Sequence, residues 1–359
     1  MLKTAAALFL ACASIAMWVG CNTTTSNRYL YAAIPGSNEI VAYREDPNSG
    51  ALTALAGSPI TAGPSVRSLA LHPSKKFLYA ANPGVFPGNI SLFTIASGGG
   101  LTEVTPRTNA GTAPTLLVMD AAGAFLYVGN SGSFDISVFS IDASSGALTQ
   151  VPGSPFPVGL SPLNMALTPS GNFLYVTGGP TQGYIEGFPV TNGTLGTPIQ
   201  PPLTGPGNDP TGLAIDSTGT HLYTANVQSN SISEFTINSD GTLAELGNSP
   251  VELQYNAPAS LAIDKSGKYL YATMQGSTNM EGFSIGSDGG LTVLTTSPFG
   301  TAVQPSFIAS DPDGEYLFVG NQQSPGTVQS FSLDKGSGTL TSVSSYSVPG
   351  TPTSIVITP

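Results

Sequence analysis

The sequence is poor in the residues that several common classes of protein depend on. Its 359 residues include 2 cysteines, 1 tryptophan and 2 histidines. Both cysteines, Cys12 and Cys21, lie near the N-terminus, so the remainder of the chain has no thiol with which to form a disulfide. The fold must therefore be held by its core and by the way the chain closes on itself.

Basic residues are also scarce. The chain has 10 lysines and arginines against 21 aspartates and glutamates, a formal net charge of −11. The basic residues are scattered, whereas nucleic acids and polyanionic surfaces require clusters of them, so we expect no nucleic-acid partner. No Ser-His-Asp pattern, CxxC pair, phosphate-binding loop or nucleotide fingerprint is present, and we expect neither a cofactor nor a metal.

The sequence does contain a repeat, which residues 120–149 illustrate. Residues 125–128 are a short apolar run, and residues 136–141 alternate apolar and polar side chains, the pattern of a strand with one buried face. Turn-forming residues separate the two. A leucine column recurs at intervals of 48 residues, with a last interval of 47: Leu30, Leu78, Leu126, Leu174, Leu222, Leu270 and Leu317. A Gly-x-Leu column accompanies it, with its glycines at Gly50, Gly99, Gly146, Gly193, Gly241, Gly289 and Gly338.

Seven copies of a unit with several short strands predict an all-β fold, a seven-bladed β-propeller with four-stranded antiparallel blades. Blade 1 is expected at 28–64. The other blades are expected at 65–112, 113–160, 161–208, 209–256, 257–303 and 304–351. The first copy lacks an inner strand, and the C-terminal run 354–358 fits that gap. We therefore expect this strand to pair with blade 1 and close the ring, which leaves no free sheet edge.

The N-terminus resembles an export signal. Lys3 precedes an apolar run of 15 residues, 5–19, which is too short to span a bilayer. Residues 19–21 resemble a lipobox, although Trp18 stands where leucine is usual. We expect a lipoprotein signal peptide at 1–20, lipidation at Cys21, a polar tether at 21–27 and a single propeller domain at 28–359. A plain secretory signal and an uncleaved anchor are the alternatives. The protein is then a cell-envelope lipoprotein, periplasmic or on the outer surface, or is otherwise secreted, with the membrane reached only through the anchor.

The repeats resemble those of the seven-bladed propeller lactonase family. Residues 125–130 read FLYVGN, and residues 136–149 read ISVFSIDASSGALT. That family includes 6-phosphogluconolactonase-type enzymes and a fungal muconate cycloisomerase. It overlaps with YVTN-repeat surface propellers, whose motif residues 175–178 nearly copy. The resemblance covers residues 28–359. It implies a carboxylic ester hydrolase acting on a lactone, with arginine, histidine and acidic side chains at the channel mouth.

Candidate ligand-binding residues are those that break the repeat. Arg67 is the only basic residue in its column, which otherwise reads Thr115, Leu163, Thr211, Ala259, Ser306 and Thr353. Asn164 stands in the next column. Asp209 lies in the long interblade loop, 198–210, and Asp135 ends a loop of blade 3. The resemblance suggests Arg67 and Asp209 as catalytic candidates.

Other polar columns are predicted to be structural. Aspartates that begin Asp-x-x-Gly turns recur at Asp120, Asp216, Asp264 and Asp311. An asparagine column contains Asn82, Asn130, Asn226 and Asn321. A repeated column spreads its side chains around a ring instead of gathering them at one point, so we read these as turn caps and packing groups. His72 and His221 occupy a turn column and a packing column, respectively.

The sequence is consistent with two functions. The first is an exported propeller, expected to be monomeric, that binds a small polar ligand at the channel mouth and hydrolyses a lactone if it is catalytic. Arg67 would then polarise the carbonyl or hold a carboxylate, and an acid such as Asp209 would orient water. The alternative is a non-catalytic cell-surface module that binds protein or glycan. It is favoured by the lack of histidine in the Arg67 column.

Overall fold

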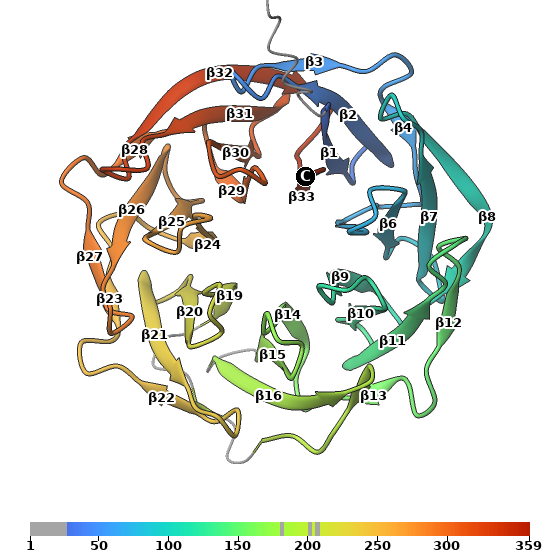
Figure 1. Cartoon of the computed structure of the whole chain (residues 1–359), viewed down its shortest axis with the longest axis horizontal. Helices are drawn as coiled ribbons and strands as arrows, with labels where there is room; N and C mark the ends of the chain where they lie inside the picture. The colour runs from blue at the N-terminus through green and yellow to red at the C-terminus, as the bar shows by residue number, and fades with distance from the viewer. Residues whose placement is uncertain (1–26, 180–182, 200–202, 205–208) are drawn as a thin grey trace, which may run out of the picture.

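Seven antiparallel sheets surround a central channel in the computed structural model (Figure 1). The structure describes residues 27–179, 183–199, 203–204 and 209–359. The predicted all-β, seven-bladed propeller is confirmed. The predicted signal peptide, Cys21 and most of the tether lie outside the described residues. No helix in the described part of the chain is long and apolar enough to cross a membrane.

The blades follow the sequence repeat. Blade 1 contains β1 (Arg28–Ile34), β2 (Glu39–Glu45), β3 (Leu52–Ala54), β4 (Ile60–Thr61) and β33 (Ser354–Ile357). Blade 2 contains β5 (Ser68–Leu71), β6 (Phe77–Asn82), β7 (Asn89–Ile95) and β8 (Leu101–Asn109). Blade 3 contains β9 (Pro114–Met119), β10 (Phe125–Asn130), β11 (Asp135–Ile141), β12 (Leu148–Gln150) and β13 (Phe156–Pro157). Blade 4 contains β14 (Pro162–Leu167), β15 (Phe173–Gly178), β16 (Tyr184–Thr191), β17 (Thr194–Leu195) and β18 (Leu203–Thr204).

The last three blades repeat the same plan. Blade 5 contains β19 (Pro210–Ile215), β20 (His221–Asn226), β21 (Ser231–Ile237), β22 (Leu243–Glu245) and β23 (Val251–Glu252). Blade 6 contains β24 (Pro258–Ile263), β25 (Tyr269–Met274), β26 (Asn279–Ile285), β27 (Leu291–Val293) and β28 (Phe299–Gly300). Blade 7 contains β29 (Pro305–Ser310), β30 (Tyr316–Asn321), β31 (Gly326–Leu333) and β32 (Leu340–Val348).

In five blades the outer strand is split into two short segments, where four continuous strands were expected. Four of these blades carry a Ser-Pro pair at the break, and proline has no N–H for the strand ladder. The serine hydroxyl compensates, because it accepts the hydrogen bond of a backbone N–H in the third strand. The pairs are Ala42 N–Ser58 Oγ, Val138 N–Ser154 Oγ, Glu234 N–Ser249 Oγ and Gly282 N–Ser297 Oγ, at 2.8–3.1 Å.

The glycines of the Gly-x-Leu column lie where neighbouring blades pack, against the residue that precedes each column leucine. The glycines of the Gly-x-Leu column have positive φ, which glycine adopts without steric cost. Each also lies under an aromatic or histidine ring of the preceding blade. A Cβ on Gly146 would lie 2.7 Å from the Phe77 ring, and one on Gly289 would lie 2.2 Å from the His221 ring. The glycine column therefore reflects blade-to-blade packing as well as turn geometry.

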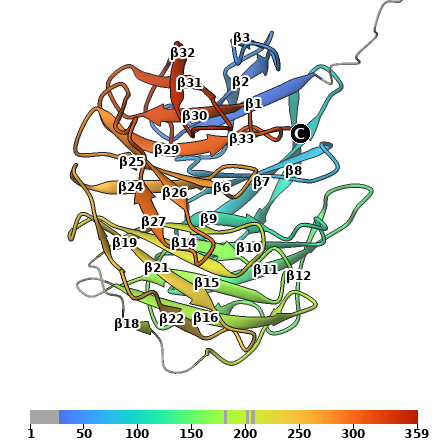
Figure 2. The same cartoon turned by 60° about the vertical axis from the view of Figure 1, so that its left-hand side comes forward.

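The C-terminal strand closes the ring as predicted. β33 pairs antiparallel with β1, with Leu30 opposite Ile357 and Ala33 opposite Ser354. Both views place these strands side by side at the channel (Figures 1 and 2). Thr358 adds a hydrogen bond from the Tyr29 N–H to its Oγ1, at 2.9 Å. The first blade is therefore assembled from both ends of the propeller.

The contact between blades 7 and 1 has a chemistry of its own. Here the column leucine, Leu317, is followed by Phe318, whereas tyrosine follows it in the other six copies, and a buried ion cluster lies nearby. Arg28 Nη1 is 2.7 Å from Asp311 Oδ2 and 3.6 Å from Glu45 Oε1, and Arg28 also pairs with Asp313. The Glu45 carboxylate has no hydrogen-bond partner among the described residues. Burial, together with the nearby Asp311 carboxylate, raises the pKa of Glu45 to about 7, although Arg28 opposes the shift.

Candidate functional site in the central channel

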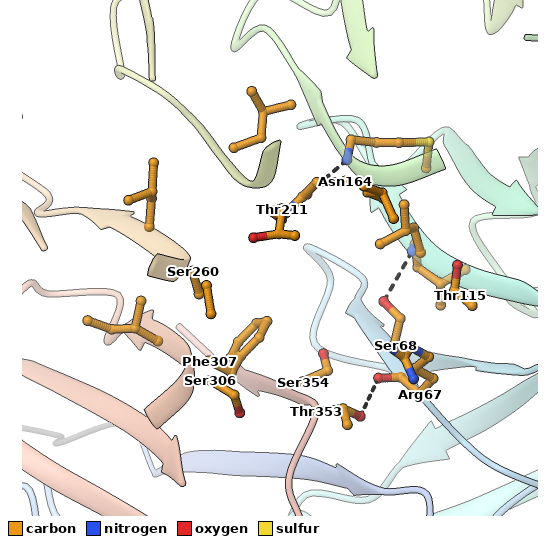
Figure 3. A pocket seen from close by; sticks show the side chains of 18 of the residues that line it. Arg67, Ser68, Thr115, Asn164, Thr211, Ser260, Ser306, Phe307, Thr353 and Ser354 are labelled. Atoms are coloured by element: carbon orange, nitrogen blue, oxygen red, sulfur yellow. Dashed lines mark hydrogen bonds between the residues drawn. The ribbon is translucent and has the colours of Figure 1, made fainter. Parts of the chain in front are cut away.

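The inner strands of the blades enclose a cavity of about 680 Å³ at one mouth of the channel (Figure 3). Because each inner strand starts at this mouth, equivalent residues form rows around it. The outermost row is Arg67, Thr115, Leu163, Thr211, Ala259, Ser306 and Thr353. The second row contains Ser68, Leu116, Asn164, Ser260, Phe307 and Ser354. The third row is Leu69, Leu117, Met165, Leu213, Leu261, Ile308 and Ile355. The cavity is thus mixed at its mouth and apolar below.

Several polar side chains at the mouth bind the backbone of the next blade. Ser354 Oγ accepts the Leu69 N–H, and Ser68 Oγ accepts the Leu117 N–H, both at 3.1 Å. Thr353 donates its hydroxyl to the Arg67 carbonyl at 2.7 Å (Figure 3). These bonds fix the inner strands relative to one another, so the lining of the mouth is a rigid part of the ring.

Arg67 and Asp209 are the only ionisable side chains among the described residues that line the cavity. Arg67 precedes β5 in blade 2 and has an exposed side chain. Asp209 precedes β19 in blade 5 and is half-buried. Blades 2 and 5 are three steps apart in a ring of seven, which is the largest separation that such a ring allows. The mouth therefore carries one positive and one negative charge on opposite sides.

The guanidinium of Arg67 is available to a ligand. It lies within ion-pairing distance of no carboxylate in the described residues. The Arg67 backbone is fixed on both sides, because its N–H donates to the Ala81 carbonyl at 3.0 Å and its carbonyl accepts from Thr353. A free cation on a fixed backbone is suited to hold a carbonyl oxygen or a carboxylate.

Asp209 occupies a strained backbone position, with φ of 61°. Aspartate tolerates this left-handed conformation better than most residues, which offers a structural reason for it. The equivalent residues in other blades are Ser65, Ala113, Ala257 and Gln304, all with positive φ. Since those residues meet the same backbone requirement without a carboxylate, the turn alone does not require aspartate at position 209.

Asn164 lies in the cavity wall, but its side-chain amide already makes two hydrogen bonds within the protein. Asn164 Nδ2 donates to the Thr211 carbonyl at 2.7 Å, and its Oδ1 accepts the Met165 N–H at 2.8 Å (Figure 3). One N–H and one lone pair remain for a ligand. Asn164 therefore joins blade 4 to blade 5 as well as facing the cavity.

Asp135 lies away from the cavity. It starts β11, the third strand of blade 3, and its Oδ1 accepts a hydrogen bond from Asn130 Nδ2 at 2.7 Å. The channel thus brings together three of the four predicted ligand-binding residues, Arg67, Asn164 and Asp209, and leaves Asp135 outside.

The columns predicted to be structural are confirmed as such. Asp264 Oδ1 accepts the N–H groups of Lys268 and Tyr269 at 2.8 Å, which caps its turn. Asn130 and its equivalents are buried and donate to side chains of the third strand in their own blades.

Both histidines lie outside the cavity lining. His72 Nε2 contacts the Gly123 carbonyl at 2.9 Å, and His221 Nδ1 contacts Asp216 Oδ2 at 2.9 Å. Within the described residues, no three histidine, cysteine or acidic side chains are placed to hold a metal ion.

Sequence reasoning missed three lining residues, Phe307, Gln275 and Gln322. Phe307 is the only aromatic among the described lining residues, and its ring points into the cavity (Figure 3). Gln275 Nε2 donates to Gln322 Oε1 at 2.9 Å across blades 6 and 7. The signal for Phe307 was present in the sequence, because it breaks a row in which serine is the commonest residue.

Comparison with known proteins supports a family assignment. A family model described as "Lactonase, 7-bladed beta-propeller" matches residues 60–160, 154–251 and 252–357. No curated protein matches the sequence. Among solved structures, a putative 6-phosphogluconolactonase from Bacteroides fragilis is similar with 20% identity and a TM-score of 0.78, over 93% of this chain and 99% of that one. The Pseudomonas aeruginosa periplasmic gluconolactonase PpgL is similar with 20% identity and a TM-score of 0.75, over 93% and 99% of the two chains. A Lactobacillus plantarum protein is similar with 23% identity and a TM-score of 0.78, over 92% and 99%. At these identities the structural likeness concerns the fold.

Proposed function

Since the chain belongs to the seven-bladed β-propeller lactonase family, we propose that its central cavity binds a lactone and hydrolyses it to the hydroxy acid. The observation that carries this proposal is the pair of opposite charges, Arg67 and Asp209, in a cavity whose other described lining residues are uncharged. A volume of about 680 Å³ is within the range of small-molecule sites and leaves room for a lactone and a water molecule.

Hydrolysis needs stabilisation of the charge that develops on the carbonyl oxygen. The Arg67 guanidinium supplies it, because no carboxylate of the described residues pairs with it and its backbone is fixed. In the reaction, water oxygen bonds to the carbonyl carbon, and the ring C–O bond then breaks. The interaction with Arg67 strengthens as the oxygen becomes an oxyanion, which is the condition for catalysis as opposed to tight substrate binding.

Asp209 is assigned to the proton transfer. From the opposite side of the mouth its carboxylate orients the attacking water and accepts a proton. It then returns that proton to the leaving ring oxygen. The two charges therefore act on different atoms of the reaction, Arg67 on the carbonyl oxygen and Asp209 on the attacking water.

The experiment is a lactone hydrolysis panel on residues 28–359, with variants R67A and D209N. We expect R67A to lower kcat/KM about 100- to 1,000-fold, and D209N to lower kcat about 100-fold or more. Arg44→Ala is the matched control, because Arg44 is an exposed arginine on β2 outside the cavity lining. Equal rates for wild type and R67A would refute the assignment.

The alternative is a binding module without catalysis. It is favoured by the lack of a histidine among the described lining residues, since histidine is the most frequent general base near neutral pH. Lactone binding that depends on Arg67 without any turnover in the panel would support this alternative. A protein or glycan ligand would instead be found by direct binding assays.

We also propose export with a lipid at Cys21, on the strength of Lys3 and the apolar run that follows it. Arg28 begins β1 opposite the end of β33, so the propeller starts at the face away from the cavity mouth. An anchor at Cys21 would leave the mouth directed away from the membrane. Mass spectrometry of the native protein should find an acylated N-terminus at Cys21, and an unmodified chain starting at Met1 would contradict this.

A further inference from the structure

We propose that the preferred substrate is a lactone bearing an alkyl substituent and not a polyhydroxylated sugar lactone. This specificity rests on the proposed function, because it assumes that the lactone ring lies at the mouth beside Arg67. It assigns the deeper part of the cavity to the substituent.

Among the described residues, the side chains that line the cavity below the mouth are apolar. In the third row, Leu213 is partly exposed to the cavity, whereas Leu69, Leu117, Met165, Leu261, Ile308 and Ile355 pack mainly into the cores between blades and present little surface to it. Val118 and Val356 continue the apolar wall. A sugar lactone bound here would lose the water around its hydroxyl groups without gaining partners, which is costly. An alkyl chain would gain from the same burial.

Phe307 extends this apolar surface up to the mouth. It lies in the second row, where three of the other six blades have serine, Ser68, Ser260 and Ser354. Its ring points into the cavity (Figure 3). Phe307 lies on β29, which contacts β33, and β33 in turn contacts β5, the strand that follows Arg67. The aromatic ring of Phe307 therefore lies two blades from Arg67, on the same side of the cavity as a ligand whose carbonyl binds Arg67.

Polar groups at the mouth are already partly committed to the ring itself. The hydroxyls of Ser68 and Ser354 each accept a backbone N–H, and Gln275 and Gln322 bind one another. Asn164 binds Thr211 and Met165. Each keeps only the hydrogen-bonding capacity that its existing bond leaves open, while the hydroxyls of Thr115 and Ser260 make no hydrogen bond to the described residues. Recognition of four or five adjacent sugar hydroxyls needs a denser array than these groups provide.

The test compares binding of δ-valerolactone, δ-hexalactone, δ-decalactone and glucono-δ-lactone to residues 28–359 by calorimetry. Affinity should rise by about fourfold for each added methylene until the apolar wall is covered. Glucono-δ-lactone should bind more weakly than δ-decalactone.

Substitutions at Phe307 separate specificity from folding. F307S introduces the residue that occupies the equivalent position in blades 1, 2 and 6, so the propeller should still fold. It should weaken δ-decalactone binding about tenfold and change glucono-δ-lactone binding by less than about twofold. F307L, which copies Leu116 of blade 3, should retain most of the preference. Phe86→Ser is the control, because Phe86 is 85% exposed and outside the cavity lining.

The outcomes distinguish this inference from the proposed function. Affinity that is independent of chain length, glucono-δ-lactone binding tighter than δ-decalactone, or an equal effect of F307S on both would overturn the specificity. Chain-length-dependent binding without turnover would support the specificity and count against hydrolysis. If the protein hydrolyses glucono-δ-lactone in preference to alkyl lactones, and R67A lowers that activity, the proposed function is supported and the proposed specificity is wrong.

Discussion

Six copies of the repeat have tyrosine directly after the column leucine, and in five of them the tyrosine hydroxyl donates a hydrogen bond to the next blade. Tyr79 Oη donates to the Gly146 carbonyl, and Tyr223 Oη donates to the Gly289 carbonyl, both at 2.8 Å. The acceptors are glycines of the Gly-x-Leu column, so two sequence columns meet in one contact. The sequence revealed both columns but could not pair them, because the partner lies about 66 residues away in another blade. Phe307 is a similar case, since its importance depends on which way its strand faces.

We expect Tyr223→Phe to destabilise the propeller by about 1–2 kcal/mol. The substitution leaves the Gly289 carbonyl buried without its donor, while the ring continues to fill the same space. Phe318 in blade 7 indicates that phenylalanine fits this position. Denaturant unfolding would measure the effect. Tyr255→Phe is the control, because the Tyr255 hydroxyl makes no hydrogen bond to the described residues. Equal stability of Tyr223→Phe and wild type would contradict the proposed role of this bond.

At the scale of elements, the interface between blades 7 and 1, called the seam below, lacks that tyrosine hydrogen bond and contains a group of buried charged side chains instead. Phe318 has no hydroxyl to donate, and the buried group Arg28, Glu45 and Asp311 lies at the same junction. Asp46 and Asp313 are the other charged neighbours. The repeat predicted that Asp311 caps a turn, which it does, with Oδ1 accepting the Glu315 N–H at 2.7 Å. Its ion pair with Arg28 could not be predicted, because Arg28 lies before the first complete copy of the repeat.

Glu45 should make this seam sensitive to pH. Its pKa is raised from 4.5 to about 7 by burial and by Asp311, against the effect of Arg28. A carboxyl whose pKa is higher in the folded state contributes stability that is full below about pH 4.5. That stability is lost as the pH rises through about 7, and amounts to about 3 kcal/mol.

Glu45→Gln removes this titration, so we expect its stability relative to wild type to increase between pH 5 and pH 8. Thermal melts of both proteins across that range would measure the difference in stability between them. The titration of other groups is the same in both proteins and does not affect this difference. Glu245→Gln is the control, because Glu245 is exposed on β22. Parallel curves for wild type and Glu45→Gln would show that Glu45 does not titrate in this range.

At the scale of the whole molecule, the fold could be predicted from the sequence and the site only in part. Seven copies with regular turn residues specify a propeller, and the missing strand before Arg28 identifies the closing partner. The cavity depends on side-chain directions and on which blades face each other across the ring. These are not periodic properties. Arg67, Asn164 and Asp209 were found because they interrupt columns, whereas Asp135 interrupted one without facing the channel.

Ring closure leads to the last prediction, which concerns deletion of residues 352–359. The deletion removes four ladder positions with β1, each hydrogen bond contributing about 0.5–1.5 kcal/mol. It also removes Ile355, which is 2% exposed and contributes about 1.5–3 kcal/mol. The sum is comparable to the total stability of a typical domain, about 5–15 kcal/mol.

With no disulfide in the described ring to hold its ends, the truncated protein should melt more than about 10 °C lower. It should also aggregate, because β1 and the neighbouring inner strands lose their cover and present unpaired backbone. Removal of Pro359 alone is the matched control, since it is exposed and follows the last contact of Thr358. Thermal melts with light scattering would compare the three proteins. If the truncated protein melts within one or two degrees of full length and stays monomeric, β33 contributes little to the stability of the propeller. The other contacts between blades are then sufficient to keep the ring closed.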